Sequence, residues 1–488
     1  MTGKKMLVLL LILLGVLAYI FLYEIPKSKE KETADLLLKG IKEEQIQRIE
    51  ITKGDRRVSL LNKNYKPEVT FGKEDKEKDS VSKNSVWELG NKAGAVLDTS
   101  LVQSLSTALL DLKLDTAIPK DELDSDLGVY GLQNPEMTIK IAYAKGELDL
   151  RLGKKNDYVF KRYFQVSGKE GVYLISDSLF TAADKNELDF RKKNLVSFSD
   201  FEVKKLNVSK GSLKLVFEKQ GDEGWRIVDP IQATGSSEKI SALLREVRDY
   251  KAEDFIDFLQ NEADSVLKQN RLDLPDLSVR IERAEGADVV QLLASEVQDL
   301  ADASKKTTVF RVDQLPFLGK INRSVISRIS MNPIDYREKK LFSYGSDVIK
   351  KAEIERAGQE KLVLELEKED WKLGSEKADQ AFVQQFYKNL SDLAAISFAD
   401  EAQSKNFGFD TPTLKITLWT NKFESDEKPT PISLVVGAET ENGYYAFAKD
   451  PKEVFVISKE ALKNISPSRE TLLPVKTEPT VTVSVSPN

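Results

Sequence analysis

Apolar and polar residues alternate over much of this chain, and single stretches with a helical period interrupt the alternation. Between residues 137 and 152, two runs place apolar side chains at every second position, as half-buried strands do. Between residues 98 and 112 apolar side chains instead recur every three or four positions, which indicates an amphipathic helix that Asp98 or Thr99 can cap. The strand positions are Met137, Ile139, Ile141, Tyr143, Leu148, Leu150 and Leu152, and the helix positions are Leu101, Val102, Leu105, Ala108, Leu109 and Leu112.

Three landmarks frame this pattern, and they return twice along the chain. A tryptophan precedes the helix, a turn ending in proline follows it, and the first such turn reads Tyr130-Gly131-Leu132-Gln133-Asn134-Pro135. Trp225 minus Trp87 is 138 and Trp371 minus Trp225 is 146, while Pro275 minus Pro135 is 140 and Pro412 minus Pro275 is 137. Landmarks in one order at one period indicate a repeat, and each repeat is long enough to hold its own core.

The sequence therefore predicts an α+β fold, with an N-terminal transmembrane helix followed by three tandem α+β repeat units with mainly antiparallel sheets. We assign the repeats to residues 45–197, 198–344 and 345–474. In the second repeat, we expect the strand Val309–Val312 to match Val172–Ile175 of the first. The charged residues 63–84 predict a solvated loop inserted in the first repeat, with a charged binding arm as the alternative. Residues 24–44 form a connector, and residues 475–488 are predicted to be a disordered tail.

The run from Met6 to Tyr23 is apolar, and as a helix it would be about 27 Å long, close to the thickness of a bilayer core. Lys4 and Lys5 precede it, so the positive-inside rule places residues 1–5 in the cytoplasm and the bulk of the chain on the periplasmic side of the inner membrane. A cleaved signal peptide is the alternative. The run is longer than a usual signal core, and no Ala-x-Ala site follows it, which favours an uncleaved anchor at residues 6–23.

The 488 residues include no cysteine and no histidine. A disulfide framework, a Ser-His-Asp triad and cysteine-bound zinc are therefore excluded. The formal net charge is -6, which gives no support for a nucleic-acid partner. Catalysis would have to use paired carboxylates or a Ser-Lys pair, and we predict no catalytic, cofactor-binding or metal-ligating residue and no cofactor.

The repeated tryptophans Trp87, Trp225 and Trp371 could be platforms on which a ligand stacks, but the sequence favours core positions, because a large ring buries much apolar area. The turns at Tyr130-Gly131 and Phe407-Gly408 lack the glycine spacing and the Lys-Ser/Thr pair of a phosphate loop, so they are interpreted as structural turns.

Two basic runs, Arg191–Lys193 and Arg337–Lys340, recur at matching places. They could meet anionic lipid, a cell-wall polymer or an acidic partner, and the sequence favours solvated segments that join repeats. The acidic cluster Asp121, Glu122, Asp124 and Asp126 is interpreted as a solvated loop, because it does not match a calcium-binding loop.

The order of these motifs resembles the DUF4340 family of bacterial membrane-anchored envelope proteins. The resemblance is closest in the first repeat. There an anchor and Trp-x-Leu precede a capped helix, and the Tyr-Gly-Leu-x-x-Pro turn follows it. Three further motifs come after the turn: Leu-x-Leu-Gly at 150–153, Val-Tyr-Leu-Ile at 172–175 and Arg-Lys-Lys-Asn-Leu at 191–195. The second repeat lacks the Tyr-Gly pair, and the third has no full Arg-Lys-Lys-x-Leu ending. The resemblance implies an accessory subunit outside the cytoplasm that accompanies ABC-type transport systems of the gliding-motility type.

We therefore expect a non-enzymatic, single-pass envelope protein that serves as an accessory or scaffold subunit of a membrane complex, with an ABC transporter permease and ATPase as partners. A module that binds envelope polysaccharide or another extracellular ligand is the second hypothesis. A carboxylate-based hydrolase is the third. If a function is localised, we expect it where the repeats differ or meet, for example at the insertion 63–84.

Overall fold

The structure, a computed structural model, describes residues 36–67, 85–92, 94–114, 116–221, 224–284, 288–298, 302, 304–342, 348–399, 407–420, 430–448 and 453–474. The chain divides into two compact units. One comprises Met1–Glu202, Val208–Ser212 and Arg245–Ile329, and the other comprises Val203–Asn207, Leu213–Leu244 and Ser330–Asn488.

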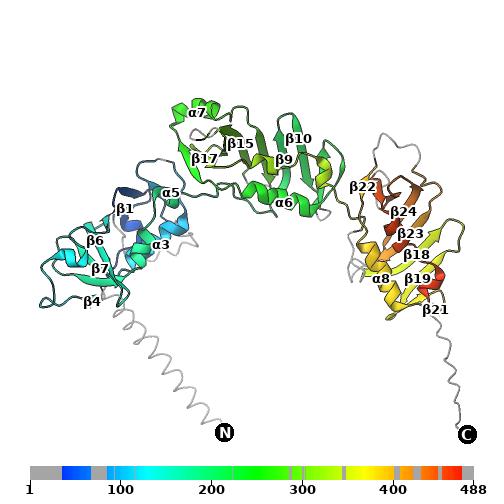
Figure 1. Cartoon of the computed structure of the whole chain (residues 1–488), viewed down its shortest axis with the longest axis horizontal. Helices are drawn as coiled ribbons and strands as arrows, with labels where there is room; N and C mark the ends of the chain where they lie inside the picture. The colour runs from blue at the N-terminus through cyan, green and yellow to red at the C-terminus, as the bar shows by residue number, and fades with distance from the viewer. Residues whose placement is uncertain are drawn as a thin grey trace, which may run out of the picture. The chain divides into compact units, whose positions relative to one another are not determined.

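The described residues form three antiparallel sheets that share one strand order (Figure 1). The order of the first sheet is β3-β2-β1-β5-β6-β7-β8-β4. Its strands are β1 (Ile46–Lys53), β2 (Arg56–Asn62), β3 (Trp87–Leu89), β4 (Thr116–Ala117), β5 (Met137–Tyr143), β6 (Gly146–Asn156), β7 (Lys161–Val166) and β8 (Tyr173–Ser176).

The second sheet follows the same plan with one more edge strand, in the order β12-β11-β10-β9-β14-β15-β16-β17-β13. Its strands are β9 (Val203–Lys210), β10 (Leu213–Lys219), β11 (Trp225–Asp229), β12 (Ala233–Gly235), β13 (Asp254–Asp257), β14 (Leu277–Arg283), β15 (Val290–Gln298), β16 (Lys306–Val312) and β17 (Phe317–Ile321).

The third sheet has the order β21-β20-β19-β18-β23-β24-β25-β26-β22. Its strands are β18 (Ile349–Arg356), β19 (Leu362–Glu367), β20 (Asp370–Leu373), β21 (Glu376–Lys377), β22 (Ser397–Phe398), β23 (Leu414–Thr420), β24 (Thr430–Glu439), β25 (Tyr444–Phe447) and β26 (Phe455–Ile457).

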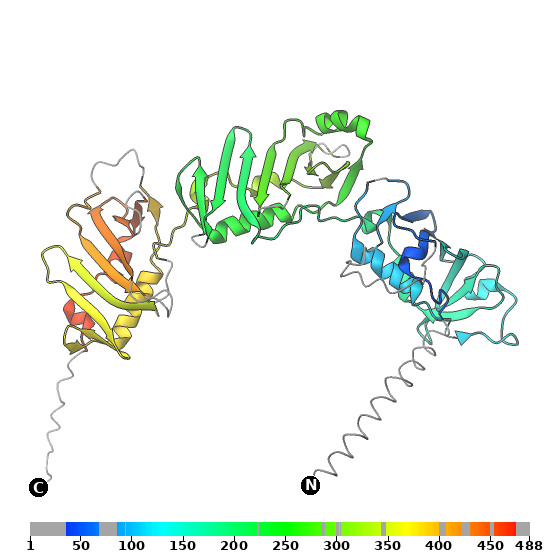
Figure 2. The same cartoon turned by 180° about the vertical axis from the view of Figure 1, so that it is seen from behind.

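One long helix lies against a face of each sheet, as both views show (Figures 1 and 2). These helices are α3 (Thr99–Leu110), α6 (Ser237–Arg248) and α8 (Gln380–Ser391), each of 12 residues. The apolar face predicted from the sequence is the buried face: Val102, Leu105 and Leu109 of α3 are buried among strand residues of the first sheet. The side chain of Asp98 caps α3, and that of Asp379 caps α8.

Short helices complete each repeat. In the first they are η2 (Glu43–Gln45), η3 (Leu127–Tyr130), α4 (Ser178–Ala183) and α5 (Glu187–Phe190). In the second they are η5 (Gln260–Glu262), α7 (Ala263–Gln269), η6 (Ile326–Arg328) and η7 (Pro333–Tyr336), and in the third α9 (Lys459–Asn464) and α10 (Arg469–Leu472).

The α+β class with antiparallel sheets is confirmed. No helix among the described residues is long and apolar enough to cross a membrane. The predicted anchor at 6–23, the residues 1–5 and the predicted tail at 475–488 lie outside the described residues. The strands of each sheet come from within one of the three predicted repeats, while the repeat boundaries stay a prediction.

One expected strand match is wrong. Val309–Val312 belongs to β16, which takes the place of β7 (Lys161–Val166) in the sheet order, and β17 (Phe317–Ile321) takes the place of Val172–Ile175. Two neighbouring strands with similar alternation of apolar residues cannot be told apart by pattern, so only their hydrogen-bonded neighbours assign them.

The Tyr-Gly turn and the Leu-x-Leu-Gly strand end are two halves of one contact. Gly131 has φ +67° in a left-handed conformation, and a Cβ on Gly153 would lie 2.2 Å from the carbonyl oxygen of Tyr130. The third repeat repeats this contact, since Gly408 has φ +72° and a Cβ on Gly437 would lie 1.9 Å from the Phe407 oxygen. The predicted structural role of these turns is therefore confirmed: the turn backbone packs directly on the strand.

The second repeat reaches the same turn geometry without glycine. Arg271 occupies the position of Gly131 with φ +58°, a conformation that costs a non-glycine residue about 1 kcal/mol. Ser295 occupies the position of Gly153, and its hydroxyl donates a hydrogen bond of 2.7 Å to the Arg271 carbonyl. The turn is therefore set by its place over the sheet and not by glycine alone.

Each repeat closes on the start of its own long helix. The backbone N–H of the capping position donates to a carbonyl at the end of the repeat, with Asp98 to Phe190 at 2.8 Å, Ser236 to Tyr336 at 2.7 Å, and Asp379 to Leu472 at 2.9 Å. The acceptor side chains Phe190, Tyr336 and Leu472 are all buried.

The arginine that follows this closure in the first two repeats is a structural joint. Arg191 is 2% exposed, its Nη1 donates to Asp257 Oδ2 at 2.9 Å, and its guanidinium lies 3.7 Å from the ring centre of Phe255 on β13. Arg337 lies in the same way 3.7 Å from the ring centre of Phe398 on β22. The interpretation of the basic runs as wholly solvated is therefore wrong for Arg191, because its side chain is used in packing.

Replacing Gly153 with alanine should destabilise the first repeat by about 3 kcal/mol, because the new methyl group would force the strand away from the Tyr130 carbonyl. Gly168→Ala is the matched control. Unlike Gly153, Gly168 has a positive φ, and it has no atom within 4 Å of a Cβ, so only the backbone cost of about 1 kcal/mol applies. Thermal unfolding of the full chain measures both, and equal shifts would contradict the close-packing argument.

Arg191→Ala should destabilise the joint by about 2 kcal/mol, since Asp257 loses its buried partner and keeps only Lys92 at 3.6 Å. Arg191→Lys should destabilise it by about 1 kcal/mol, since lysine keeps the charge but loses the planar stacking. Hydrogen exchange at the amides of β13 should rise in that order. Lys192→Ala is the control, because the Lys192 side chain is only partly buried and is not one of the side chains that form the joint. Unchanged β13 protection in Arg191→Ala would show that the joint does not hold this strand.

Candidate functional site

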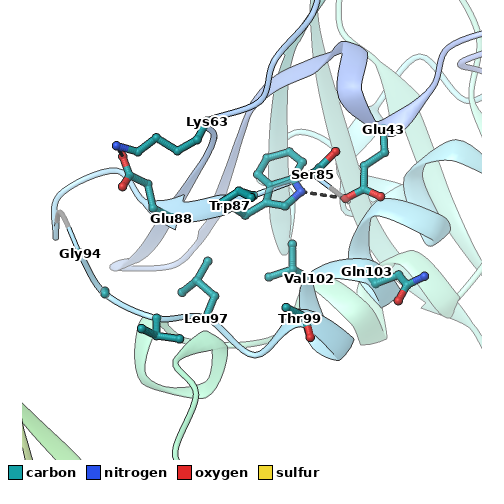
Figure 3. A pocket seen from close by; sticks show the side chains of 13 residues that line it. Glu43, Lys63, Ser85, Trp87, Glu88, Gly94, Leu97, Thr99, Val102 and Gln103 are labelled. Carbon is teal, nitrogen blue, oxygen red and sulfur yellow. Dashed lines mark hydrogen bonds and ion pairs between the residues drawn. The ribbon is translucent and has the colours of Figure 1, made fainter. Parts of the chain in front are cut away.

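A pocket of about 470 Å³ lies beside Trp87 in the first repeat (Figure 3). Strand β3 forms one wall, and the segment that leads into α3, together with the first turns of that helix, forms the other. Most of the lining is apolar, and a few polar side chains lie at its edges. It is lined by Glu43, Lys63, Ser85, Val86, Trp87, Glu88, Gly94, Ala95, Val96, Leu97, Thr99, Val102 and Gln103.

One carboxylate lines the pocket and is fixed by two donors. The Trp87 indole Nε1 donates to Glu43 Oε1 at 2.8 Å, and the hydroxyl of Ser106 lies 3.3 Å from the same oxygen. The second carboxylate at the rim, Glu88, is paired with Lys63 at 2.9 Å. Glu43 has no cationic partner among the ion pairs of the described residues, so it is the unpaired carboxylate of a mostly apolar site.

The second and third repeats place a large residue where the first has Ser106. Counting from the capping residue of each long helix, Ser106 corresponds to Leu244 in α6 and to Tyr387 in α8, and all three side chains are buried. In the third repeat the Tyr387 ring lies 4.8 Å from the Trp371 ring, centre to centre. Burial raises the pKa of Tyr387 well above its usual range. The small Ser106 leaves room for the Glu43 carboxylate beside Trp87, where the third repeat has an aromatic ring.

The helix that forms one wall of the pocket is held at its first turn. Asp98 Oδ1 accepts hydrogen bonds from Ser100 Oγ at 2.5 Å and from the Ser100 backbone N–H at 3.0 Å. The hydroxyl of Ser100 is the largest cause that lowers the pKa of Asp98 from its ordinary value. Asp98 therefore stays ionised as a cap, and Thr99 and Val102 keep a defined place in the pocket wall.

The predicted core role of the repeated tryptophans is confirmed, since Trp87, Trp225 and Trp371 are 8%, 5% and 8% exposed. These rings therefore do not form an exposed platform on which a ligand such as a sugar could stack. Trp87 is a core residue and also lines the pocket, a combination that the sequence pattern did not predict.

The acidic cluster is a solvated loop, as predicted. Asp126 caps η3 through a 2.8 Å hydrogen bond from the Gly128 N–H, and Asp124 accepts from the Asp126 N–H at 2.8 Å. Both carboxylates serve the local turn and are exposed. Within the parts of the chain that the structure describes, no group of three or more Asp or Glu side chains is placed to hold a metal ion.

The ends of the charged insertion predicted at 63–84 lie at the pocket. Lys63 and Ser85, which lies directly after the insertion, both line it, while residues 68–84 lie outside the described residues. One sequence signal could have led to the pocket. At the helix position of Ser106, the first repeat has a small residue where the other two have a large one. Only a comparison among the repeats reveals this difference beside Trp87.

No curated protein and no solved structure was found to match this chain. A family model, the domain of unknown function DUF4340, matches residues 87–275 and 374–474. The first matched stretch begins at Trp87 and ends at Pro275, two of the repeated landmarks. The matches cover more than half of the 488 residues, so the chain belongs to the DUF4340 family.

Proposed function

We propose that this protein is a single-pass, membrane-anchored accessory or scaffold protein of the cell envelope, with its repeats outside the cytoplasm, and that it is an auxiliary component of an ABC-type transport complex. The anchor is the apolar segment at residues 6–23, and the three repeats form the part that meets the partner. The role is non-enzymatic and needs no cofactor. A permease and an ATPase are the expected partners.

The observation that carries this proposal is that the recurring residues serve the architecture. The tryptophans are core residues, the Tyr-Gly turns pack on strand glycines, and Arg191 and Arg337 stack on phenylalanines. These recurring contacts serve packing and not chemistry, which suits a scaffold better than a single catalytic centre. The absence of histidine and cysteine from the sequence supports the same reading.

A ligand-binding role is the second candidate, and the pocket at Trp87 favours it. Pockets for small molecules are typically concave and mostly apolar, with few polar groups that orient the ligand, and 470 Å³ lies within their usual size range. The fixed Glu43 carboxylate would select a ligand with an amine or another hydrogen-bond donor attached to an apolar body. An extended sugar surface fits less well, because Trp87 is buried.

Purification of the tagged full chain in mild detergent, from cells that naturally make it, should co-purify an ABC permease and its ATPase. A chain without residues 1–23, exported by a cleavable signal, is the control for contacts made by the anchor alone. It should retain the partner less well, but above the level of an unrelated single-pass protein. Mass spectrometry of the eluates measures this, and eluates that contain no transporter subunit would contradict the accessory role.

The pocket should bind 2-phenylethylamine more tightly than neutral 2-phenylethanol, because only the amine can pair with Glu43. Glu43→Gln should weaken amine binding about tenfold, since a partly buried ion pair contributes on the order of 1–2 kcal/mol. Fold is expected to persist, because the amide oxygen still accepts from Trp87. Glu44→Gln, one residue away and outside the pocket lining, is the matched control. Calorimetry on the full chain measures both, and equal affinity for the two probes would contradict this site.

A further inference from the structure

The tip of the β6–β7 hairpin in the first repeat exposes three consecutive apolar side chains. Tyr158 is 96% exposed, Val159 is 50% exposed and Phe160 is 74% exposed. Single exposed apolar residues are common on protein surfaces, but two aromatic rings in one tight turn form a small projecting apolar surface. None of the three packs into the cores of this repeat.

The base of this hairpin is firmly held. Arg162 is 5% exposed, and its guanidinium donates to Asp177 Oδ1 at 2.6 Å, to Glu136 Oε2 at 2.7 Å and to the Gly153 carbonyl at 2.6 Å. Asn156 accepts from the Tyr158 N–H at 3.0 Å and donates to the Tyr163 hydroxyl at 2.8 Å. The apolar tip is thus presented on a fixed support.

The sequence at the tip is poorly explained by folding alone. Phe160 has φ +54°, a left-handed conformation in which glycine or asparagine would be the ordinary choice, and its ring is exposed. A bulky aromatic residue in that conformation costs stability and gains no core packing in return. Its ring lies 6.0 Å from the Lys155 Nζ and otherwise faces solvent, so it is available to a partner outside the fold of this repeat.

The corresponding hairpins of the other two repeats have no aromatic tip. The β15–β16 connection reads Asp-Leu-Ala-Asp-Ala-Ser-Lys at 299–305, and the β24–β25 connection reads Thr-Glu-Asn-Gly at 440–443. The aromatic tip is therefore peculiar to the repeat that directly follows the apolar N-terminal segment.

The register of the first sheet places this tip at the end where the described chain begins. Lys161 of β7 pairs with Ser176 of β8, and Thr116 of β4 pairs antiparallel with Leu174, so the residues before Thr116 lie toward the Ser176 end. Leu36 forms a bridge with Lys113, just before β4. Leu36 and the hairpin tip therefore lie toward the same end of the sheet.

The chain between the apolar segment and Leu36 is short. Only residues 24–35 separate them, and a fully extended chain of that length reaches about 45 Å. If residues 6–23 span the bilayer, the end of the sheet that carries the tip must stay within that distance of the membrane surface.

We propose that Tyr158, Val159 and Phe160 form a second membrane contact, which inserts into the interface of an anionic bilayer and fixes the first repeat against it. Aromatic side chains favour the interfacial region, and basic residues beside them favour anionic headgroups. Lys154, Lys155 and Lys161 flank the tip, with Asp157 as the one acidic residue of the turn. This inference rests on the membrane anchoring in the proposed function.

The absence of cysteine allows a specific test. Val159→Cys in the full chain, labelled with the dye NBD and reconstituted in nanodiscs of phosphatidylcholine and phosphatidylglycerol, keeps both aromatic rings. We expect a blue shift of NBD emission and quenching by lipids that carry a doxyl group on the acyl chain. Asn442→Cys at the matching hairpin of the third repeat is the control, and its label should show neither effect.

Two further variants test how much the aromatic rings and the lysines each contribute to this membrane contact. Tyr158→Ser with Phe160→Asn, in the labelled Val159→Cys chain, should lose the blue shift and the quenching while the thermal unfolding midpoint stays the same or rises, because asparagine tolerates the left-handed conformation. Lys154→Gln with Lys155→Gln should reduce quenching in anionic nanodiscs to the level in pure phosphatidylcholine. Equal quenching in both lipids before this change would overturn the role of the lysines.

The outcomes separate the two levels of the proposal. A chain that co-elutes with nanodiscs but whose label at 159 is not quenched overturns the tip contact and leaves the anchor intact. A chain that fails to co-elute overturns both. A blue shift without quenching by lipid would place the tip against protein and would overturn the bilayer as its partner.

Discussion

The hydrogen bond from the capping residue of each long helix to the end of its own repeat is the constraint on which the rest depends. The first residue of an α-helix has a backbone N–H with no partner inside the helix, and the capping residue before it directs its own N–H outward. In Asp98, Ser236 and Asp379 that donor meets the backbone carbonyl of a buried residue near the end of the repeat. One bond thereby joins the helix, which covers the sheet, to the segment that follows the last strand of the repeat, which is β8, β17 or β26.

This closure also determines where the next residue lies. Because Phe190 and Tyr336 are held at the helix start, Arg191 and Arg337 leave the repeat at a fixed point and reach the ring of a phenylalanine on an edge strand, Phe255 or Phe398. Stacking on a ring uses the planar guanidinium, so lysine would not serve equally well. The third repeat ends in Leu472 and Leu473, with no arginine after its closure. The joint occurs after the first and the second repeat.

The sequence predicted this architecture because its signals are local and repeated. The alternation of apolar and polar residues predicted the strands. The capping residue Asp98 and the apolar face with Leu105 and Leu109 predicted the helix. The prediction failed where the decisive interaction is not local. Val309–Val312 was matched to the wrong strand, because the place of a strand in the sheet is defined by its hydrogen-bonded neighbours and not by its apolar pattern. Arg271 shows the same limit, since a left-handed turn without glycine has no signature in a single sequence. The pocket at Trp87 needs Glu43, far away in the sequence, and no periodicity brings the two together.

The three repeats also offer an internal comparison that separates structure from function. Some positions that serve the fold keep their chemistry in all three repeats, as the buried tryptophans do. At the Tyr387 position the third repeat packs two rings together at a tilt, whereas the first has a serine and a half-buried carboxylate beside the indole, which forfeits an aromatic contact of about 1 kcal/mol. At the β6–β7 tip the first repeat again departs from the others by exposing Tyr158 and Phe160 at a cost. Both departures weaken the fold of the repeat that carries them, and both lie in the first repeat. These two departures mark the first repeat as the copy in which we propose that this chain meets a ligand or a surface.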